Sequence, residues 1–203
     1  MSTPAPPSAA PSPNKLARPL EPLLPHLELD AAGATLLEGA PDAAAGLENL
    51  VAADRLPDAL RLIAHALPKR EAVWWACMCA RGVPAQEASA VDAEALTAAE
   101  LWVRRPDDAS RRATMEPAQK GGFRSAESWA AVGAFWSGGN ISADGLPEVE
   151  PAANLTGVAV VGAILLAAMR HSPERAPQRF MRFIASARDI AIGGAGRIPP
   201  EGG

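Results

Sequence analysis

Aromatic residues are scarce in this sequence. It contains no tyrosine, and aromatic side chains make up only 4% of its 203 residues, while apolar residues account for 48%. A core must therefore be built mainly from alanine, leucine, valine and isoleucine, and alanine and leucine are among the strongest helix formers. No segment combines β-branched residues with the sustained alternation of a strand. The composition predicts an all-α protein.

Cysteine and histidine are also rare, with two and three residues respectively. Cys77 and Cys79 lie two positions apart on a predicted helix, so their side chains point about 200° apart and should not bridge each other. His26, His65 and His171 are too distant in sequence to suggest the four ligands of a structural zinc site. We therefore expect no disulfide framework, no metal site and no cofactor, and we interpret the cysteines as buried thiols in a reducing compartment.

An excess of basic residues is missing, because the net charge is −4. This balance argues against a general nucleic-acid-binding protein. The charge is nevertheless uneven, since residues 28–58 hold seven acids and one base while residues 170–197 hold six arginines and two acids. Such a dipolar surface can steer an acidic partner, and simple solvation of helix faces is the alternative interpretation.

Long apolar runs are absent as well. The apolar stretch from Asn154 to Met169 holds 16 residues, which is short of the roughly 20 residues that a membrane-spanning helix needs. It is better interpreted as a buried central helix. The first residues lack the apolar core of a secretory signal. We therefore expect a cytoplasmic protein with no membrane-inserted segment.

Proline is concentrated at the start, where residues 1–25 hold eight prolines. This composition favours extended polyproline conformations over a packed core. A cluster of glycines near residue 194 ends the last predicted helix. The predicted organisation is a flexible proline-rich arm over residues 1–26, a helical domain over residues 27–193 and a loose tail over residues 194–203.

Proline, glycine and capping residues divide the domain into helices. A regular helical period begins near Asp42, after an irregular stretch over residues 27–40. We predict Asp107, Ser125 and Asn154 as N-terminal caps. The predicted helices after residue 56 cover residues 57–67, 68–81, 87–104, 107–120, 125–136, 154–169 and 177–192, with a long loop over residues 138–153. The sequence thus predicts a single compact bundle of about six to eight helices.

Two groups of tryptophans are candidates for a binding surface, because tryptophan is enriched at the hot spots of interfaces. The first group is Trp74 and Trp75, on the predicted helix over residues 68–81. The helical period places Trp74 on one face with Cys77, Met78 and Arg81, and turns Trp75 partly away. The second group is the corner at which Trp136 ends a helix, before Ser137, Gly138, Gly139 and Asn140.

The corner carries a possible nucleophile. Ser137 is followed by two glycines whose amides could form an oxyanion hole. The order Trp-Ser-Gly-Gly, however, lacks both the strand–turn–helix setting and the Gly-x-Ser-x-Gly pattern of a hydrolase. We interpret the corner as the end of a helix and assign no catalytic residue.

Three motifs together resemble an uncharacterised bacterial family of small helical proteins. They are Leu67–Cys77, which contains Trp-Trp-Ala-Cys, then Ala99–Val103, and Ala134–Gly139, which contains Phe-Trp-Ser-Gly-Gly. The resemblance extends over about residues 50–193. It implies a helical fold and an association with bacterial type VI secretion, and it brings no catalytic residues.

The sequence therefore predicts a non-enzymatic accessory or adaptor domain that binds a protein partner, linked to a type VI secretion system. The partner and the oligomeric state are left open. The alternative is an enzyme or small-ligand-binding protein with a pocket between the Trp74/Trp75 helix and the Trp136 corner. The candidate binding residues are Trp74, Trp75, Arg81, Trp136, Ser137, Gly138, Gly139 and Asn140.

Overall fold

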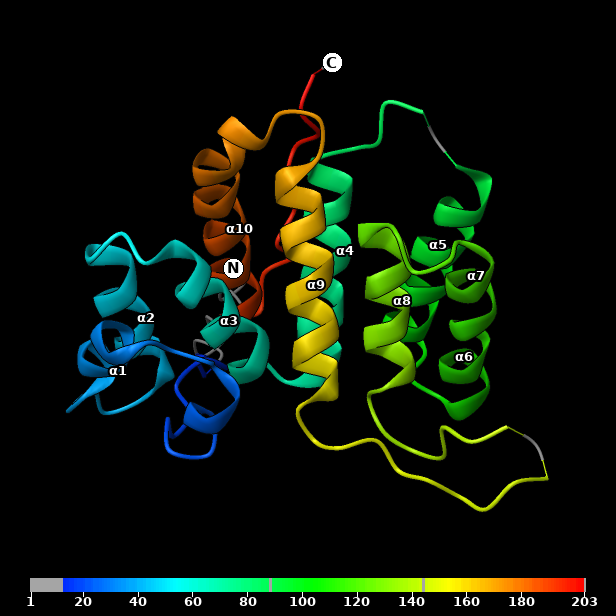
Figure 1. The fold of residues 1–203 in the computed structure, drawn as a ribbon, viewed down its shortest axis with the longest axis horizontal. Coiled ribbons are helices and arrows are strands. Elements are labelled where there is room, and N and C mark those ends of the chain that lie inside the picture. Colours follow the sequence, from blue (N-terminus) through cyan, green and yellow to red (C-terminus); the bar gives the residue numbers. More distant parts are fainter. Residues whose placement is uncertain (1–12, 88, 144, 203) are drawn as a thin grey trace, which may run out of the picture.

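The structure, a computed structural model, describes residues 13–87, 89–143 and 145–202 (Figure 1). The all-α prediction is confirmed, since these residues form helices and no strand. Two short 3₁₀ helices span Leu24–His26 and Pro173–Arg175. The α-helices are α1 (Ala31–Leu37), α2 (Ala43–Ala52), α3 (Leu56–Ala66), α4 (Lys69–Gly82), α5 (Ala90–Arg104), α6 (Asp108–Ala113), α7 (Met115–Lys120), α8 (Ala126–Phe135), α9 (Leu155–Met169) and α10 (Ala176–Ala191).

Helix α9 lies at the centre of the bundle. It packs against α3 on one side and α8 on the other, with α4 behind it in the view of Figure 1. Helices α1, α2 and α10 extend the α3 side, while α5, α6 and α7 extend the α8 side. The alanines of α9 at positions 159, 163 and 167 are all fully buried. A four-residue spacing of small side chains lets neighbouring helices approach closely, which explains how an uncharged helix occupies the centre.

The predicted helix over residues 107–120 is interrupted in the structure. Asp107 caps α6 as predicted, by accepting a hydrogen bond from the amide of Ser110. Pro117 has no amide hydrogen, so it cannot donate to the carbonyl of Ala113, and a new helix begins after Thr114. The prediction that Asn154 caps α9 is wrong, because Asn154 has a helical backbone and its side chain makes no capping hydrogen bond.

Helix α1 lies in the stretch that the sequence pattern left irregular. Asp30 caps it by accepting a hydrogen bond from the amide of Gly33. The carboxylate of Asp30 also pairs with Arg55, which precedes α3. These contacts hold the pKa of Asp30 below its ordinary value, through the Gly33 amide first and the Arg55 guanidinium second. A seven-residue helix has too few turns to show a clear period, which is why the pattern missed it.

The proline-rich arm is packed against the domain from residue 13 onward, whereas we predicted it to be flexible through residue 26. Leu16 and Leu20, one helical turn apart in sequence, are buried at 2% and 8% exposure. The amide of Lys15 donates a hydrogen bond to the carbonyl of Ala191, and the backbone carbonyl of Arg18 accepts one from the amide of Ala43. Burial of the two leucines is favourable because it removes apolar surface from water, and it holds the proline-rich chain against the domain. The remainder of the predicted arm, residues 1–12, lies outside the described residues.

Within residues 13–87, 89–143 and 145–202, no single helix is both long enough and apolar enough to cross a membrane. Helix α9 and the segment Pro173–Ala191 meet the length and composition test only as a pair, bent by 114°.

His65 on α3 is in tight contact with α9. A Cβ atom on Gly157 would lie 2.4 Å from the His65 ring, so only glycine permits this approach. The ring also stacks on His26, with 5.8 Å between the ring centroids. Burial, and then the neighbouring His26, lower the pKa of His65 from 6.5 to about 4.

We expect His65 to make the fold less stable in mild acid. As the pH falls from 6.5 towards 4, the unfolded chain binds a proton that the folded chain resists, so the free energy of unfolding decreases across this window. The expected loss is about 1–2 kcal/mol, because partial exposure of the ring reduces the effect below the ~1.4 kcal/mol per pKa unit of a buried group. Urea unfolding at pH 7 and pH 4.5, compared with His65→Phe, measures it. Equal pH dependence in both proteins would contradict the assignment.

Candidate functional site

The Trp136 corner is held together by its backbone carbonyl groups. Arg111 of α6 is buried at 4% exposure and donates hydrogen bonds to the carbonyl of Phe135 at 2.7 Å and that of Asn140 at 2.9 Å. Lys69, the first residue of α4, donates to the carbonyl of Ser137 at 2.9 Å. The corner is therefore the point at which α4 and α6 are tied to the end of α8.

The glycines and Asn140 complete this arrangement. Gly139 has a φ of 65°, and a Cβ atom there would lie 3.0 Å from the Arg111 guanidinium. The side-chain oxygen of Asn140 accepts hydrogen bonds from the amides of Ser142 and Val149, at 2.9 and 3.0 Å. It thereby closes the base of the loop over residues 138–153. Gly138 has open space around its Cα. These contacts support the interpretation of the corner as a structural element.

The indole of Trp136 packs at the edge of the same region. Its ring meets that of Trp129 in an edge-to-face arrangement, with 6.3 Å between the centroids. Its carbonyl accepts a hydrogen bond from the Thr156 hydroxyl at the start of α9. Trp136 thus joins α8 to α9.

The two tryptophans of α4 differ in burial, and in the opposite sense to the one that the helical period indicated. Trp75 is fully buried, and its indole donates a hydrogen bond to the carbonyl of Phe183 in α10 at 2.8 Å. Trp74 is partly exposed, and its indole donates to the carbonyl of Ala195 at 2.8 Å. The expectation that Trp75 faces partly outward is therefore wrong. Of the two, Trp74 is the residue available to a partner.

Trp74 lines two cavities, and Arg104 lines both of them with it. One has a volume of about 340 Å³ and extends towards Lys15, Arg70 and the end of α10. The other has a volume of about 410 Å³ and extends towards Arg81, Arg104 and the chain after α10. We call this face, from Lys15 past Trp74 to Arg197, the Trp74 surface. Trp136 lines neither of these cavities in the described part of the chain.

The Trp74 surface is basic, although the whole chain is acidic. Its two cavities are lined by five bases, Lys15, Arg70, Arg81, Arg104 and Arg197, and by two acids, Glu71 and Glu100. The two acids are already paired. Glu71 lies 2.6 Å from the Lys15 ammonium group, and Glu100 is bound by Arg81 and lies 3.7 Å from Arg104. The remaining positive charge would attract an acidic partner.

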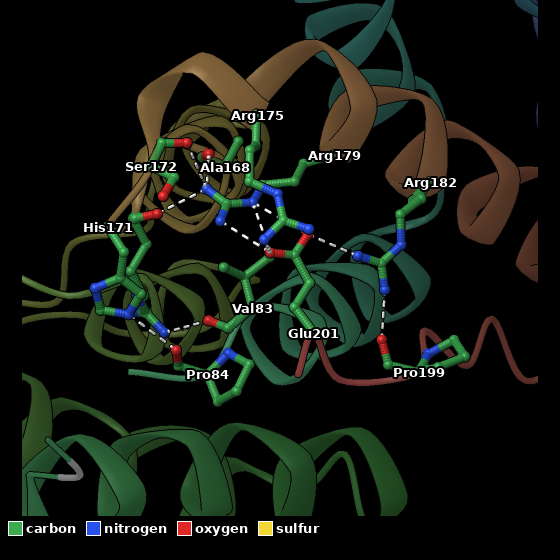
Figure 2. A network of polar contacts seen from close by, with 11 residues as sticks. Val83, Pro84, Ala168, His171, Ser172, Arg175, Arg179, Arg182, Pro199 and Glu201 are labelled. Atoms are coloured by element: carbon green, nitrogen blue, oxygen red, sulfur yellow. Dashed lines mark hydrogen bonds and ion pairs between the residues drawn. The ribbon is translucent and has the colours of Figure 1, made fainter. Parts of the chain in front are cut away.

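The segment after α10 forms one wall of this surface, and it is not the loose tail that we predicted. We call residues 194–202 the C-terminal segment. Ile198 is buried at 8% exposure, and Gly196 donates its amide hydrogen to the Asp189 carboxylate at 2.7 Å. Near its end, Glu201 is surrounded by the guanidinium groups of Arg175, Arg179 and Arg182 (Figure 2). Sequence reasoning noted the arginine-rich segment but not the carboxylate that it surrounds.

Cys77 and Cys79 are both buried free thiols, as the sequence indicated. Burial is the main cause that raises the pKa of each thiol above its ordinary value, so neither is an activated nucleophile. Across residues 13–87, 89–143 and 145–202, no group of three or more histidine, cysteine, aspartate or glutamate side chains is arranged to hold a metal ion. The groups that line the Trp74 surface are aromatic, apolar and charged, with bases in excess over acids.

Comparison with known proteins assigns the chain to a family without assigning it an activity. A model of the Family of unknown function (DUF6931) matches residues 46–191, so the chain belongs to this family. No curated protein and no solved structure matches the chain. The matched range begins in α2 and ends with α10, so it includes Trp74 and excludes the C-terminal segment.

Proposed function

We propose that this member of the DUF6931 family is a non-enzymatic helical adaptor that binds a protein partner at the Trp74 surface. The observation that carries the proposal is a partly exposed tryptophan that lines two cavities. A tryptophan in this position can bury a large apolar area with little loss of side-chain entropy, which is typical of interface hot spots.

The charge of the surface supports an acidic segment as the part of the partner that is bound. The five bases that line the cavities exceed the two acids by three positive charges, and Arg70 and Arg197 form no ion pair with either acid. Arginine is well suited to this role, because its planar guanidinium group binds carboxylates through two parallel hydrogen bonds. Arg81 keeps half of its side chain exposed while it holds Glu100, so it is accessible to a partner.

We further propose that the partner belongs to a bacterial type VI secretion system and that the adaptor acts in the cytoplasm. The resemblance of the Trp-Trp-Ala-Cys and Phe-Trp-Ser-Gly-Gly motifs supports the first part. The two unpaired thiols, Cys77 and Cys79, are compatible with the second, because the cytoplasm keeps thiols reduced.

The test compares two tryptophan variants in partner capture. Tagged wild-type protein, Trp74→Ala and Trp136→Ala would be expressed in the native bacterium, with and without its type VI secretion genes, and the retained proteins quantified by mass spectrometry. We expect Trp74→Ala to reduce capture of a secretion component by about tenfold or more, since hot-spot tryptophans contribute 2 kcal/mol or more. Trp136→Ala, the matched control, should retain it.

Three other outcomes would each refute one part of the proposal. Loss of capture only in Trp136→Ala would transfer the binding site to the corner and refute the Trp74 surface. Capture that persists in a strain without type VI secretion genes would refute the secretion link alone. Capture of no partner by the wild type would refute the adaptor function.

A further inference from the structure

The C-terminal segment lies along a groove between α4 and α10 in the manner of a bound peptide. Its backbone is held at several points rather than by regular secondary structure. The carbonyl of Ala195 accepts a hydrogen bond from the Trp74 indole, and the carbonyl of Gly196 accepts one from the Ser186 hydroxyl. Further along, the Arg182 guanidinium donates to the carbonyl of Pro199. The groove therefore binds an extended backbone.

One apolar side chain of the segment enters the groove at a glycine. Ile198 is buried against Gly82, the last residue of α4, where a Cβ atom would lie 2.5 Å from Cγ2 of Ile198. The carbonyl of Gly82 accepts a hydrogen bond from the amide of Glu201 at 3.0 Å. Gly82 thus leaves space for a branched apolar side chain and also fixes the backbone three residues later.

The groove ends in a carboxylate-binding site built from arginines. Arg179 is buried at 2% exposure, and it binds Glu201 at 2.9 Å. Arg182 lies 2.8 Å and Arg175 lies 3.4 Å from the same carboxylate, whose side chain is only 10% exposed (Figure 2). Three guanidinium groups face one carboxylate, so the site retains an excess of positive charge.

Arg179 is oriented independently of the segment. Its Nη1 donates to the carbonyls of Ala168 and Arg170, each at 2.7 Å, at the end of α9 and just after it. These two residues lie at the C-terminal end of α9 and not in the C-terminal segment. The guanidinium group is therefore positioned to bind a carboxylate before one arrives, which reduces the entropy lost on binding.

The family model matches the groove but not the segment that now fills it. Gly82, Arg179 and Arg182 all lie within the residues that the family model matches, whereas residues 194–202 lie beyond its end at residue 191. The binding features thus belong to the part of the chain that the family model matches, and the peptide that fills them does not.

We propose that the groove between α4 and α10 is a recognition site for an extended acidic segment of a protein partner, with an apolar residue three positions before a carboxylate. The C-terminal segment, with Ile198 and Glu201 at this spacing, is its intramolecular competitor. The proposal rests on the proposed function for the existence of a partner, and it deepens that function by naming the segment that is recognised next to Trp74. Displacement of the competitor opens the wall that Ala195 and Ile198 now form.

The competition has a predictable strength. A tethered segment acts at an effective concentration of roughly millimolar, so a free peptide of the same sequence binds the wild type only weakly. Glu201→Gln removes the charge but keeps the shape of the side chain. It should weaken the tethered segment and make the groove accessible, because loss of one partner of a buried charge pair strongly weakens binding.

The experiment measures peptide binding to the full-length protein by fluorescence anisotropy. The probe is a fluorescein-labelled peptide with the sequence of residues 194–202. We expect its apparent Kd to be about tenfold or more lower for Glu201→Gln than for the wild type. A peptide with glutamine at the Glu201 position should bind the Glu201→Gln protein about tenfold or more weakly than the original peptide.

Two further variants keep the result interpretable. Arg182→Gln, added to Glu201→Gln, should weaken peptide binding, and its side chain is 34% exposed, so the fold tolerates the change. If Glu201→Gln fails to fold, as judged by circular dichroism, Ile198→Ala weakens the competitor at its apolar residue and should increase peptide binding in the same way.

Equal binding by the wild type and both weakened proteins would overturn the proposal, as would equal affinity for the two peptides. Failure here and failure of the proposed function can be distinguished. Peptide binding without any captured partner would refute the adaptor function only. Partner capture that neither Glu201→Gln nor Ile198→Ala increases would refute the groove as the recognition site and leave the adaptor function intact.

Discussion

Trp75→Ala should lower the free energy of unfolding by about 3–5 kcal/mol, the usual cost of removing a buried tryptophan. The Trp75 side chain is completely buried between α4 and α10, so the substitution leaves a large cavity. It also leaves the carbonyl of Phe183 without the indole hydrogen that it now accepts at 2.8 Å. That carbonyl lies inside α10 and keeps its helical hydrogen bond from the amide four residues later, so the cavity accounts for most of the cost.

Trp74→Ala is the matched control, one residue away on the same helix. Trp74 is partly exposed and contacts the C-terminal segment, so its replacement should cost only about 1 kcal/mol of stability while reducing partner binding. Guanidinium chloride unfolding of the two variants, followed by circular dichroism, gives the comparison. An equal or larger stability loss in Trp74→Ala would contradict the assignment of Trp75 as the buried tryptophan.

Arg179→Leu should also lower the free energy of unfolding by about 3–5 kcal/mol, the usual effect of removing one partner of a buried ion pair. Leucine fills part of the space but cannot bind the Glu201 carboxylate. It also removes the guanidinium hydrogen bonds to the carbonyls of Ala168 and Arg170, of which Arg170 still accepts from the amide of Ser172. Arg182→Leu is the control, because Arg182 is partly exposed and binds the same carboxylate. The control should lose less than about 1 kcal/mol, the range of exposed pairs.

The arginines around Glu201 also make the free energy of unfolding depend on pH. Chiefly the hydrogen bonds from Arg179, and then the charges of the surrounding arginines, hold the pKa of Glu201 below its ordinary value of 4.5. The stabilisation is therefore present above pH 4.5 and is lost as the pH falls through the lower pKa of the folded protein. In acid the stability difference between wild type and Arg179→Leu should narrow. A difference that is unchanged down to complete protonation would show that Arg179 acts only through the carbonyls.

Local features of the sequence were sufficient to locate most helices. The apolar stripes of α3 and α10 repeat at the helical period, and each helix lies at the predicted place because the stripe faces one side of the core. Ser125 and Asp107 cap their helices as predicted, since capping depends only on residues within one turn. The helical period also identified Arg81 and the two tryptophans of α4 as candidates for the binding surface. It did not show which of the two tryptophans is exposed.

The features that could not be predicted from the sequence depend on contacts between residues far apart in the chain. Helix α4 is surrounded by α5, α8, α9 and α10, and its middle from Ala72 to Ala80 is entirely apolar. Its pattern therefore carries little information about which tryptophan faces solvent. The packed C-terminal segment depends on contacts of a different kind, because Glu201 meets Arg179 across 22 residues and Trp74 meets Ala195 across 121. Helix periods and caps are read within a few residues of the chain. Side-chain burial on a surrounded helix, and the binding of a segment rich in glycine and proline, depend on partners that only the folded chain brings together.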